Sequence, residues 1–132
     1  MRKSLKKRIF EKIKRSKKRV FLRKNFAALG DYDQVGRALR ELMDEKKLIR
    51  LGYGLYVKTR KNIYTGQIMI DGAFEEIAIE ALERLKVDWE YGSLIQDYQK
   101  GSEQIPARLD VIINDRFQRK IGVDRYQLYI EK

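Results

Sequence analysis

The chain of 132 residues carries 30 Lys and Arg against 19 Asp and Glu, a formal net charge of +11, and 43% of its residues are hydrophobic. That length and apolar content suit one globular domain or two small ones, while so large a positive charge on a short chain indicates a polyanionic partner. Cys and His are both absent, which excludes disulfides, thiolate zinc sites and the commonest general base, so we expect no metal, no cofactor and no enzymatic activity.

The charge is unevenly distributed along the chain. Residues 1–61 hold 21 basic and 6 acidic residues, a net charge of +15. Residues 62–132 hold 9 basic and 13 acidic residues, a net charge of −4. This shift predicts a basic polyanion-binding domain at 1–61 and a small interaction domain at 62–132. The basic N-terminus lacks the apolar stretch of a signal peptide, and the chain has no apolar run long enough to span a membrane. We therefore expect a cytoplasmic protein with no membrane partner.

Residues 4–16 predict a first helix, because Leu5, Ile9 and Ile13 recur at i, i+4 and i+8 on one face. The rest of this helix is basic, and positions 1–19 hold 11 Lys and Arg with Glu11 as the one acidic residue. A basic helical face is ordinarily solvated surface, but self-repulsion at this density favours contact with phosphates. The candidate phosphate contacts on this helix are Lys6, Lys7, Lys12, Lys14 and Arg15.

Residues 19–22 predict a short strand that pairs with a later hairpin, and residues 23–29 predict a short helix before Gly30. Asp31 occupies an N-cap position, and Gln34 three residues later completes a capping box, so a second helix should begin here. The apolar positions of this second helix form one buried face, which consists of Val35, Ala38, Leu39 and Leu42.

The opposite face of the second helix carries Arg37 and Arg40 one turn apart. One interpretation is a surface ion pair for each arginine with an acidic residue four positions away, worth ~0.2–0.5 kcal/mol. In the first turns of a helix that enters the DNA major groove, arginine is the commonest donor to guanine O6 and N7. We therefore favour contact with bases or phosphates for these two arginines. Gly36 costs ~1 kcal/mol relative to Ala inside a helix, so either DNA or the preceding helix should approach closely there.

Residues 48–51 and 55–57 predict two short strands around a tip at Gly52-Tyr53-Gly54. Arg50 and Lys58 alternate with apolar neighbours and should project outward from this hairpin. Tyr53 either contacts deoxyribose and phosphate or covers its own strand. Gln34 also has two interpretations, of which we place local capping first and readout of adenine second.

A short helix, a tight turn, a capped helix and a hairpin follow one another in the order of a winged helix-turn-helix. We therefore predict an α+β protein in which a winged helix-turn-helix N-terminal domain binds double-stranded DNA and a small α+β domain with an antiparallel sheet follows. The capped helix is expected to enter the major groove. The predicted DNA contacts are Lys6, Lys7, Lys12, Lys14, Arg15, Lys24, Tyr32, Gln34, Gly36, Arg37, Arg40, Arg50, Tyr53 and Lys58.

The second half predicts a helix at 73–86 with an apolar core face and an exterior of Glu75, Glu76, Glu80 and Glu83. A strand at 87–91, a helical turn at 93–98, a loop at Pro106 and strands at 109–113, 117–123 and 126–130 follow, with turns at 114–115 and 124–125. Amphipathic aromatics are frequent in this half, and they either fill the core or mark a protein-binding surface. They are Trp89, Tyr91, Tyr98, Tyr126 and Tyr129.

Two other functions stay open from the sequence. A structured-RNA binder would use the same basic face, although the chain lacks the aromatic stacking platforms typical of RNA readers. A Mg²⁺-dependent nuclease would use Asp110 and Lys120, because Asp110 followed by Gln118-Arg119-Lys120 is similar to the metal site of restriction-type nucleases. That pattern is short and has no dependable second acidic ligand, so we rank the nuclease last.

The segment VFLRKNFAALGDYDQVGRALRELMDEKKLIRLGYGLYVK, residues 20–58, resembles the N-terminal winged-helix domain of the AbiEi-type (type IV) antitoxin family. The later EALERL and QIPARLDVIINDRFQRKIG resemble the C-terminal half of its short relatives. The resemblance implies a DNA-binding autorepressor with DNA contacts at Arg37, Arg40, Arg50 and Tyr53. In full-length antitoxins the C-terminal domain counters a nucleotidyltransferase-like toxin, so we expect residues 73–132 to bind either a toxin or a second copy of the chain.

Overall fold

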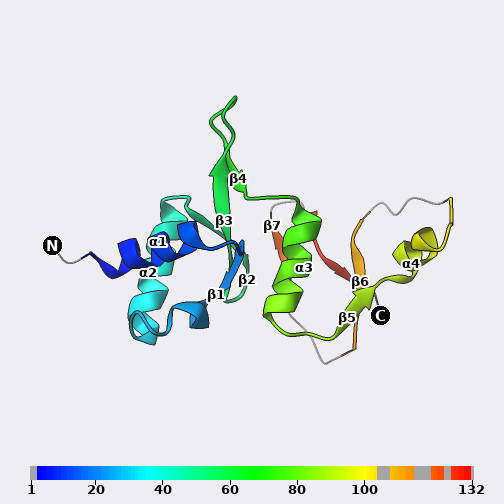
Figure 1. The fold of residues 1–132 in the computed structure, drawn as a ribbon, viewed down its shortest axis with the longest axis horizontal. Coiled ribbons are helices and arrows are strands. Elements are labelled where there is room, and N and C mark those ends of the chain that lie inside the picture. The colour runs from blue at the N-terminus through cyan, green and yellow to red at the C-terminus, as the bar shows by residue number, and fades with distance from the viewer. Residues whose placement is uncertain (1–2, 104–107, 115–119, 124–125, 132) are drawn as a thin grey trace.

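The computed structural model describes residues 3–103, 108–114, 120–123 and 126–131, and it confirms the predicted α+β class (Figure 1). Among those residues no helix is long and apolar enough to cross a membrane. In chain order the elements are α1 (Leu5–Arg15), β1 (Val20–Leu22), the 3₁₀ helix η1 (Arg23–Phe26), α2 (Tyr32–Asp44), β2 (Leu48–Gly52), β3 (Leu55–Lys61), β4 (Ile68–Ile70), α3 (Phe74–Arg84), β5 (Trp89–Tyr91), α4 (Ser93–Gln99), β6 (Asp110–Ile113), β7 (Gly122–Val123), β8 (Tyr126–Gln127) and β9 (Tyr129–Ile130).

The start of α2 is fixed by the capping box that the sequence predicts. The backbone N–H of Gln34 donates to Asp31 Oδ1 at 2.8 Å, and the N–H of Asp31 donates to Gln34 Oε1 at 3.4 Å. The side chain of Ser4 caps α1 in a similar way by accepting from the N–H of Lys7 at 3.2 Å. Both helices therefore satisfy part of their free N-terminal donors with their own side chains.

The central sheet has the strand order β1-β3-β2 with antiparallel pairing, so the short strand at the start of the fold does pair with the hairpin as predicted. Its apolar residues alternate between the two faces, and both faces are covered. In β3, Leu55 and Val57 point to one apolar cluster and Tyr56 points to the other. The two faces explain why each residue of β1 is buried.

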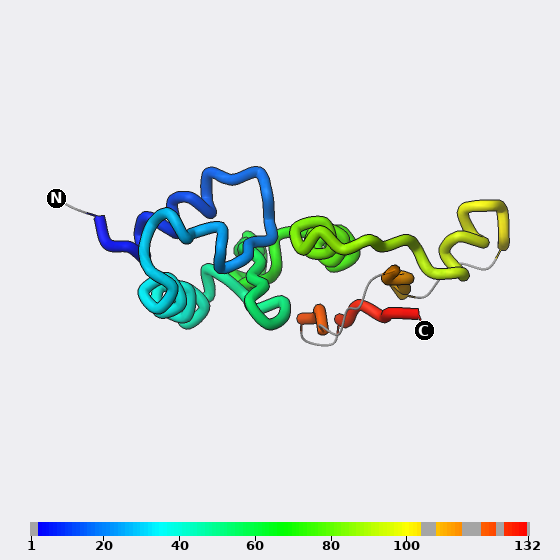
Figure 2. The backbone as a smooth tube through the Cα atoms, turned by 90° about the horizontal axis from the view of Figure 1, so that it is seen from below, coloured from blue at the N-terminus to red at the C-terminus, as the bar shows by residue number. Residues whose placement is uncertain are grey.

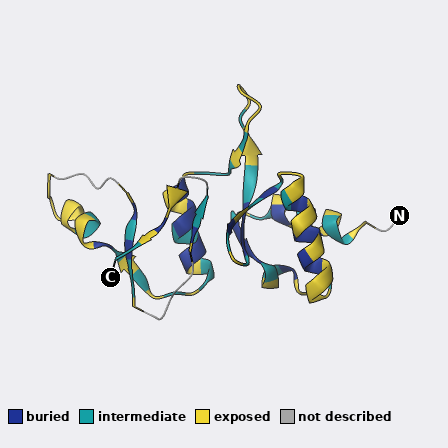
Figure 3. Ribbon diagram, turned by 180° about the vertical axis from the view of Figure 1, so that it is seen from behind, coloured by how far each residue is buried: buried dark blue, intermediate teal, exposed yellow. Residues whose placement is uncertain are grey.

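Two apolar clusters lie on opposite faces of this sheet (Figure 3). The first joins α1 and α2 to the sheet through residues such as Ile9, Leu39 and Leu42. The second joins α3 to the sheet, where Ile77 and Leu82 pack in the same cluster as Val20. Residues on both sides of the predicted boundary at residue 61 thus share one core, and the division into two domains stays a prediction.

Side chains of α3 also bond to the outer edge of β1. Glu80 accepts the backbone N–H groups of Arg19, at 2.8 Å, and Val20, while Arg84 Nε donates to the carbonyl of Val20 at 2.8 Å. Arg19 forms an ion pair with Glu76 at 2.9 Å. Because β1 is an edge strand, these bonds satisfy donors and an acceptor that no further strand reaches. Glu75, Glu76 and Glu83 are exposed, as predicted. Glu80 is half-buried against β1, so its predicted exterior position is wrong.

β3 continues beyond the predicted strand and forms a second hairpin with β4. Thr59, Arg60 and Lys61 pair in antiparallel register with residues 68–70. Figure 1 shows this hairpin extending well away from the helices and the sheet. The segment in which the sequence predicted a domain boundary thus contains a projecting hairpin.

The C-terminal sheet differs from the predicted antiparallel arrangement. β5 and β6 pair antiparallel, but β9 joins β6 in parallel register, and β7 and β8 form a separate hairpin. The last predicted strand is divided at Leu128, whose buried side chain lies in the second core, so the chain passes there from one sheet to the other. Figure 2 shows α4 at the end of the molecule opposite α1 and α2. The predicted loop at Pro106 and the predicted turn at 124–125 lie outside the described residues, as do most of residues 114–119.

Candidate nucleic-acid interface

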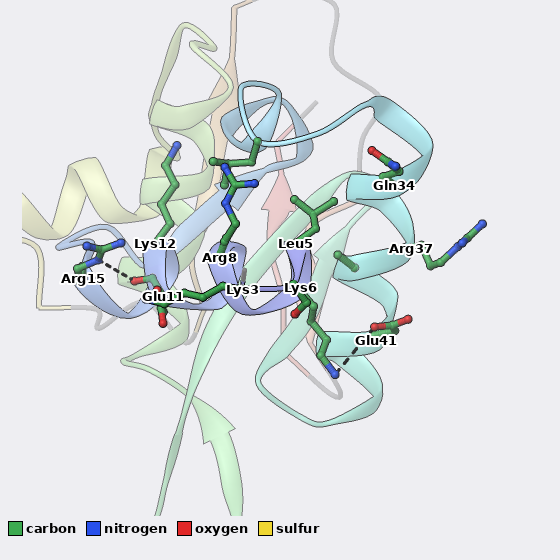
Figure 4. Close-up of a pocket in the computed structure, with 13 residues that line it drawn as sticks. Lys3, Leu5, Lys6, Arg8, Glu11, Lys12, Arg15, Gln34, Arg37 and Glu41 are labelled. Atoms are coloured by element: carbon green, nitrogen blue, oxygen red, sulfur yellow. Dashed lines mark hydrogen bonds and ion pairs between the residues drawn. The ribbon is translucent and has the colours of Figure 1, made fainter. Parts of the chain in front are cut away.

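The exposed face of α2 carries the two arginines that helical periodicity placed there. Arg37 and Arg40 are exposed, and the described part of the chain shows no ion pair between either of them and an acidic side chain. The ion pairs considered at i, i+4 thus do not form. In Figure 4 the Arg37 side chain points away from α1 into solvent. Both guanidinium groups are therefore available for base edges or phosphates.

Arg23 is a residue that the sequence analysis missed, and it joins η1 to the first turn of α2. Its Nη2 donates to the carbonyl of Tyr32 at 2.7 Å, and its guanidinium lies 3.6 Å from the centre of the Tyr32 ring. A Cβ added to Gly36 would lie 1.7 Å from Arg23 Nη2. Gly36 is buried beneath this side chain, so contact with the preceding helix explains the glycine without DNA. The interior glycine was the one signal in the sequence that a side chain crosses α2 there.

Replacing Gly36 by Ala should change the stability of the protein by less than about 1 kcal/mol. The gain in helix propensity, ~1 kcal/mol, opposes the loss of the Arg23 hydrogen bond and of its stacking on Tyr32. In an Arg23→Ala background that loss disappears, and Gly36→Ala should then stabilise by about 1 kcal/mol. Chemical denaturation of the four proteins measures both effects. Equal stabilisation in the two backgrounds would show that Arg23 is not what requires the glycine.

A cleft of about 430 Å³ lies between η1, the start of α2 and the turn that joins β2 to β3. Four of the predicted DNA contacts line this cleft, namely Lys24, Tyr32, Arg50 and Tyr53. Arg23, which was not predicted, lines it as well. Its described lining holds no acidic residue: Leu22, Arg23, Lys24, Tyr32, Arg50, Tyr53, Gly54, Tyr56 and Leu85. A concave surface with three cations and three tyrosine rings has the chemistry to bind phosphate and sugar.

A larger groove of about 1360 Å³ runs between α1 and α2, and Figure 4 shows its lining. It brings the predicted Lys6, Lys12 and Arg15 of α1 to the same surface as Gln34 and Arg37 of α2. Unlike the cleft, this groove contains carboxylates. Lys3 pairs with Glu11 at 2.9 Å, and Lys6 lies 3.9 Å from Glu41. The positive charge of the groove is therefore partly neutralised within the protein.

Several cations predicted to contact phosphate are already engaged in the fold. The hydrogen bond to Glu45 raises the pKa of Lys6, and the same bond, followed by that of Lys47, lowers the pKa of Glu45. Lys12 Nζ donates to the carbonyl of Asn25 at 2.8 Å. Lys58 is half-buried and donates to the carbonyl of Ser16 at 2.8 Å, so the prediction that it projects outward is wrong. The Lys58 side chain thus links β3 to Ser16, the residue that follows α1.

The remaining basic residues of α1 differ in their surroundings. Lys7 and Lys14 are exposed, and Lys14 Nζ lies 5.3 Å from the centre of the Phe10 ring. Arg15 Nε donates to the carbonyl of Glu11 at 3.3 Å, which leaves the rest of its guanidinium exposed. These three side chains lie on the outside of the fold, as predicted.

The residues considered for a nuclease site give no metal-binding cluster in the described part of the chain. Asp110 accepts a hydrogen bond from Arg108 Nε at 2.8 Å, and no group of three or more potential metal ligands occurs among the described residues. Lys120 is exposed. Gln118 and Arg119 lie outside the described residues, and the nuclease alternative stays untested.

Aromatic residues of the C-terminal half divide between core and surface. Trp89 and Tyr91 are half-buried and meet edge to face with ring centres 5.1 Å apart. Tyr98, Tyr126 and Tyr129 are exposed. Tyr126 also stacks against Phe74, and Arg108 lies over the ring of Tyr129. The interpretation as core residues thus fits Trp89 and Tyr91. The three tyrosines are the members of the predicted aromatic set that lie on the surface.

The described residues form a basic α+β protein in which no acidic side chain lines the cleft and the two exposed arginines of α2 form no ion pair. By comparison with known proteins, the chain belongs to the family described as a family of unknown function, DUF6088, which it matches over residues 8–132. No curated protein matches it.

Proposed function

We propose that this protein binds double-stranded DNA through a winged helix-turn-helix and acts as a transcriptional regulator. In this proposal α1, η1 and α2 are the three helices, β1 and the β2–β3 hairpin form the small sheet, and α2 is the recognition helix. The order of these elements and the pairing of β1 with β3 support the assignment. The resemblance to type IV antitoxins extends the proposal to autorepression.

The observation that carries the proposal is the cleft at the N-terminal end of α2, whose described lining includes no acidic residue. The cleft joins the N-terminal end of α2 to the turn of the β2–β3 hairpin through Arg23, Lys24 and Arg50. A phosphate there would meet cations from three elements at once, and α2 would then be fixed relative to the DNA backbone. Arg37 lies in the first turns of the same helix and is exposed, so backbone contact and base contact would come from one end of α2.

Replacing Lys24 and Arg50 together by Gln should weaken duplex binding and make it less dependent on salt. Each phosphate contact contributes a slope of about −0.9 to the plot of log affinity against log salt concentration, so loss of both should reduce the slope by about 2. Fluorescence anisotropy of a labelled duplex over a salt series measures this change. A slope equal to that of the wild type would mean that the cleft does not hold phosphate.

Competition between nucleic acids separates DNA regulation from RNA binding. The full-length protein is first bound to duplex DNA taken from upstream of its own gene, and structured RNA is then added at the same salt concentration. We expect RNA to compete poorly, because recognition helices fit the major groove of B-form DNA and the deep, narrow major groove of RNA excludes them. Preference for RNA would overturn the proposed function.

The proposed regulator would use its C-terminal half to bind protein. Exposed Tyr98, Tyr126 and Tyr129 support this part, because tyrosine is enriched at protein interfaces. The partner would be a second copy of the chain or a toxin, as the antitoxin resemblance implies. Sedimentation of the protein alone and with the product of the neighbouring gene distinguishes these two partners.

A further inference from the structure

The hairpin formed by β3 and β4 has an ordered tip at residues 62–67. Asn62 Oδ1 accepts the backbone N–H groups of Tyr64 and Thr65 at 2.8 and 3.1 Å. The carbonyl of Asn62 accepts the N–H of Gly66 at 2.8 Å, and the N–H of Asn62 donates to the carbonyl of Gln67, also at 2.8 Å. Gly66 has a φ of +74°, which glycine adopts without steric cost. The turn thus satisfies its own backbone groups and holds its side chains outward.

Two large apolar side chains stand at this tip, where they contact almost nothing in the protein. Ile63 is 86% exposed and Tyr64 is 91% exposed, and Figure 3 shows the end of this hairpin in the colour of exposed residues. Single exposed apolar residues are common on protein surfaces. An adjacent pair on a projecting hairpin is less easily explained by chance, because it adds apolar surface without stabilising the fold.

The hairpin and its base are strongly basic. From Leu55 to Ile70 the chain has Lys58, Arg60 and Lys61 and no acidic residue. The base of the hairpin lies beside two other basic segments, since Thr59 Oγ1 donates to the carbonyl of Lys46 and Lys58 Nζ donates to the carbonyl of Ser16. The exposed cations at and around this base show no ion pair in the described part of the chain: Lys17, Lys18, Lys46, Arg60 and Lys61.

We infer that the β3–β4 hairpin is a second DNA-contacting element, distinct from the cleft and from α2. Arg60 and Lys61 bind backbone phosphates, and Ile63 and Tyr64 lie against the sugars and base edges of a groove. This inference rests on the proposed DNA binding and adds a site to it. The choice of DNA over a protein partner follows from charge, because Arg60, Lys61 and three further cations without ion pairs in the described part of the chain lie at and around the base of the hairpin, and its described residues include no acid. Apolar side chains flanked by cations are a common means of contacting the DNA minor groove.

The test compares full-length variants on one labelled duplex over a salt series. Lys61→Gln removes an exposed cation from the hairpin, and Lys100→Gln removes an exposed cation at the end of α4, far from it. At about 0.1 M salt, loss of one phosphate contact should weaken binding roughly five- to tenfold and reduce the salt slope by about 0.9. Lys100→Gln should bind like the wild type. Ile63→Ser with Tyr64→Ser should weaken binding without changing the slope, because no charge is removed.

The possible outcomes separate the hairpin from the proposed function. If the wild type itself fails to bind duplex DNA, the proposed function is wrong and this inference falls with it. If the wild type binds and the hairpin variants bind equally well, only the hairpin inference is overturned. It is also overturned if the Ile63 and Tyr64 double variant binds DNA normally but changes the oligomeric state seen by sedimentation, since the tip is then a protein contact.

Discussion

Glu80→Ala should lower the free energy of unfolding by about 2–4 kcal/mol. The carboxylate of Glu80 accepts the backbone N–H groups of Arg19 and Val20 at the partly buried edge of β1. Removing it leaves two donors without a partner, and because this edge is only partly buried each donor should cost about 1–2 kcal/mol, the lower part of the range for buried donors. For a chain of this length the melting temperature should fall by about 8–15 °C. Thermal and urea denaturation followed by circular dichroism measure both quantities.

Two further substitutions make that experiment specific. Glu83→Ala removes an exposed carboxylate from the same helix and should change stability by less than about 0.5 kcal/mol. Glu80→Gln keeps an oxygen that accepts both bonds, so it should lose less stability than Glu80→Ala. If Glu80→Ala and Glu83→Ala are equally mild, the bonds between α3 and β1 contribute little to the fold.

The same contacts bear on how the two halves unfold. Because α3 and β1 share a core cluster as well as these bonds, the chain should unfold in one cooperative transition. A division at residue 61 would instead expose Val20, Leu55 and Val57 on the free face of the sheet. The charge boundary at residue 61 therefore separates two electrostatic halves, whereas the packing joins them.

Elements fixed by local chemistry were predictable from the sequence. The capping box at Asp31 and Gln34 sets the start of α2, and helical periodicity correctly placed Arg37 and Arg40 on its exposed face. Two short apolar runs on either side of Gly52-Tyr53-Gly54 similarly located β2 and the start of β3. In each case the signal lies within a few residues of the structure it predicts.

Features that depend on contacts distant in sequence were not predictable. Residues 58–61 carry no apolar alternation, so nothing local shows that β3 continues to pair with β4. Glu80 looks like any exterior glutamate until β1 lies beside it, and Lys58 looks exposed until the end of α1 supplies a carbonyl. Arg23 is similar, because its position over Gly36 depends on the angle between η1 and α2. Side chains that link elements thus accounted for most of the differences in the candidate site.

Arg37→Ala should weaken binding to the natural DNA site by about 5- to 150-fold and weaken binding to random duplex much less. The Arg37 side chain is exposed, forms no ion pair in the described structure and lies in the first turns of the proposed recognition helix. A bidentate contact with guanine contributes ~1–3 kcal/mol of discrimination, which corresponds to this range of affinities. Fluorescence anisotropy with the labelled natural site and with a scrambled duplex of equal length gives the two dissociation constants.

Lys7→Ala is the matched control, because Lys7 is also an exposed cation and lies on α1. If it contacts DNA, it does so through phosphate, and its loss should weaken both duplexes alike. The decisive quantity is the ratio of the two affinities, which should fall for Arg37→Ala and stay constant for Lys7→Ala. An Arg37→Ala protein that loses affinity equally for both duplexes would have lost a phosphate contact, and sequence readout would then have to come from another residue of α2, with Arg40 the nearest exposed arginine on that face.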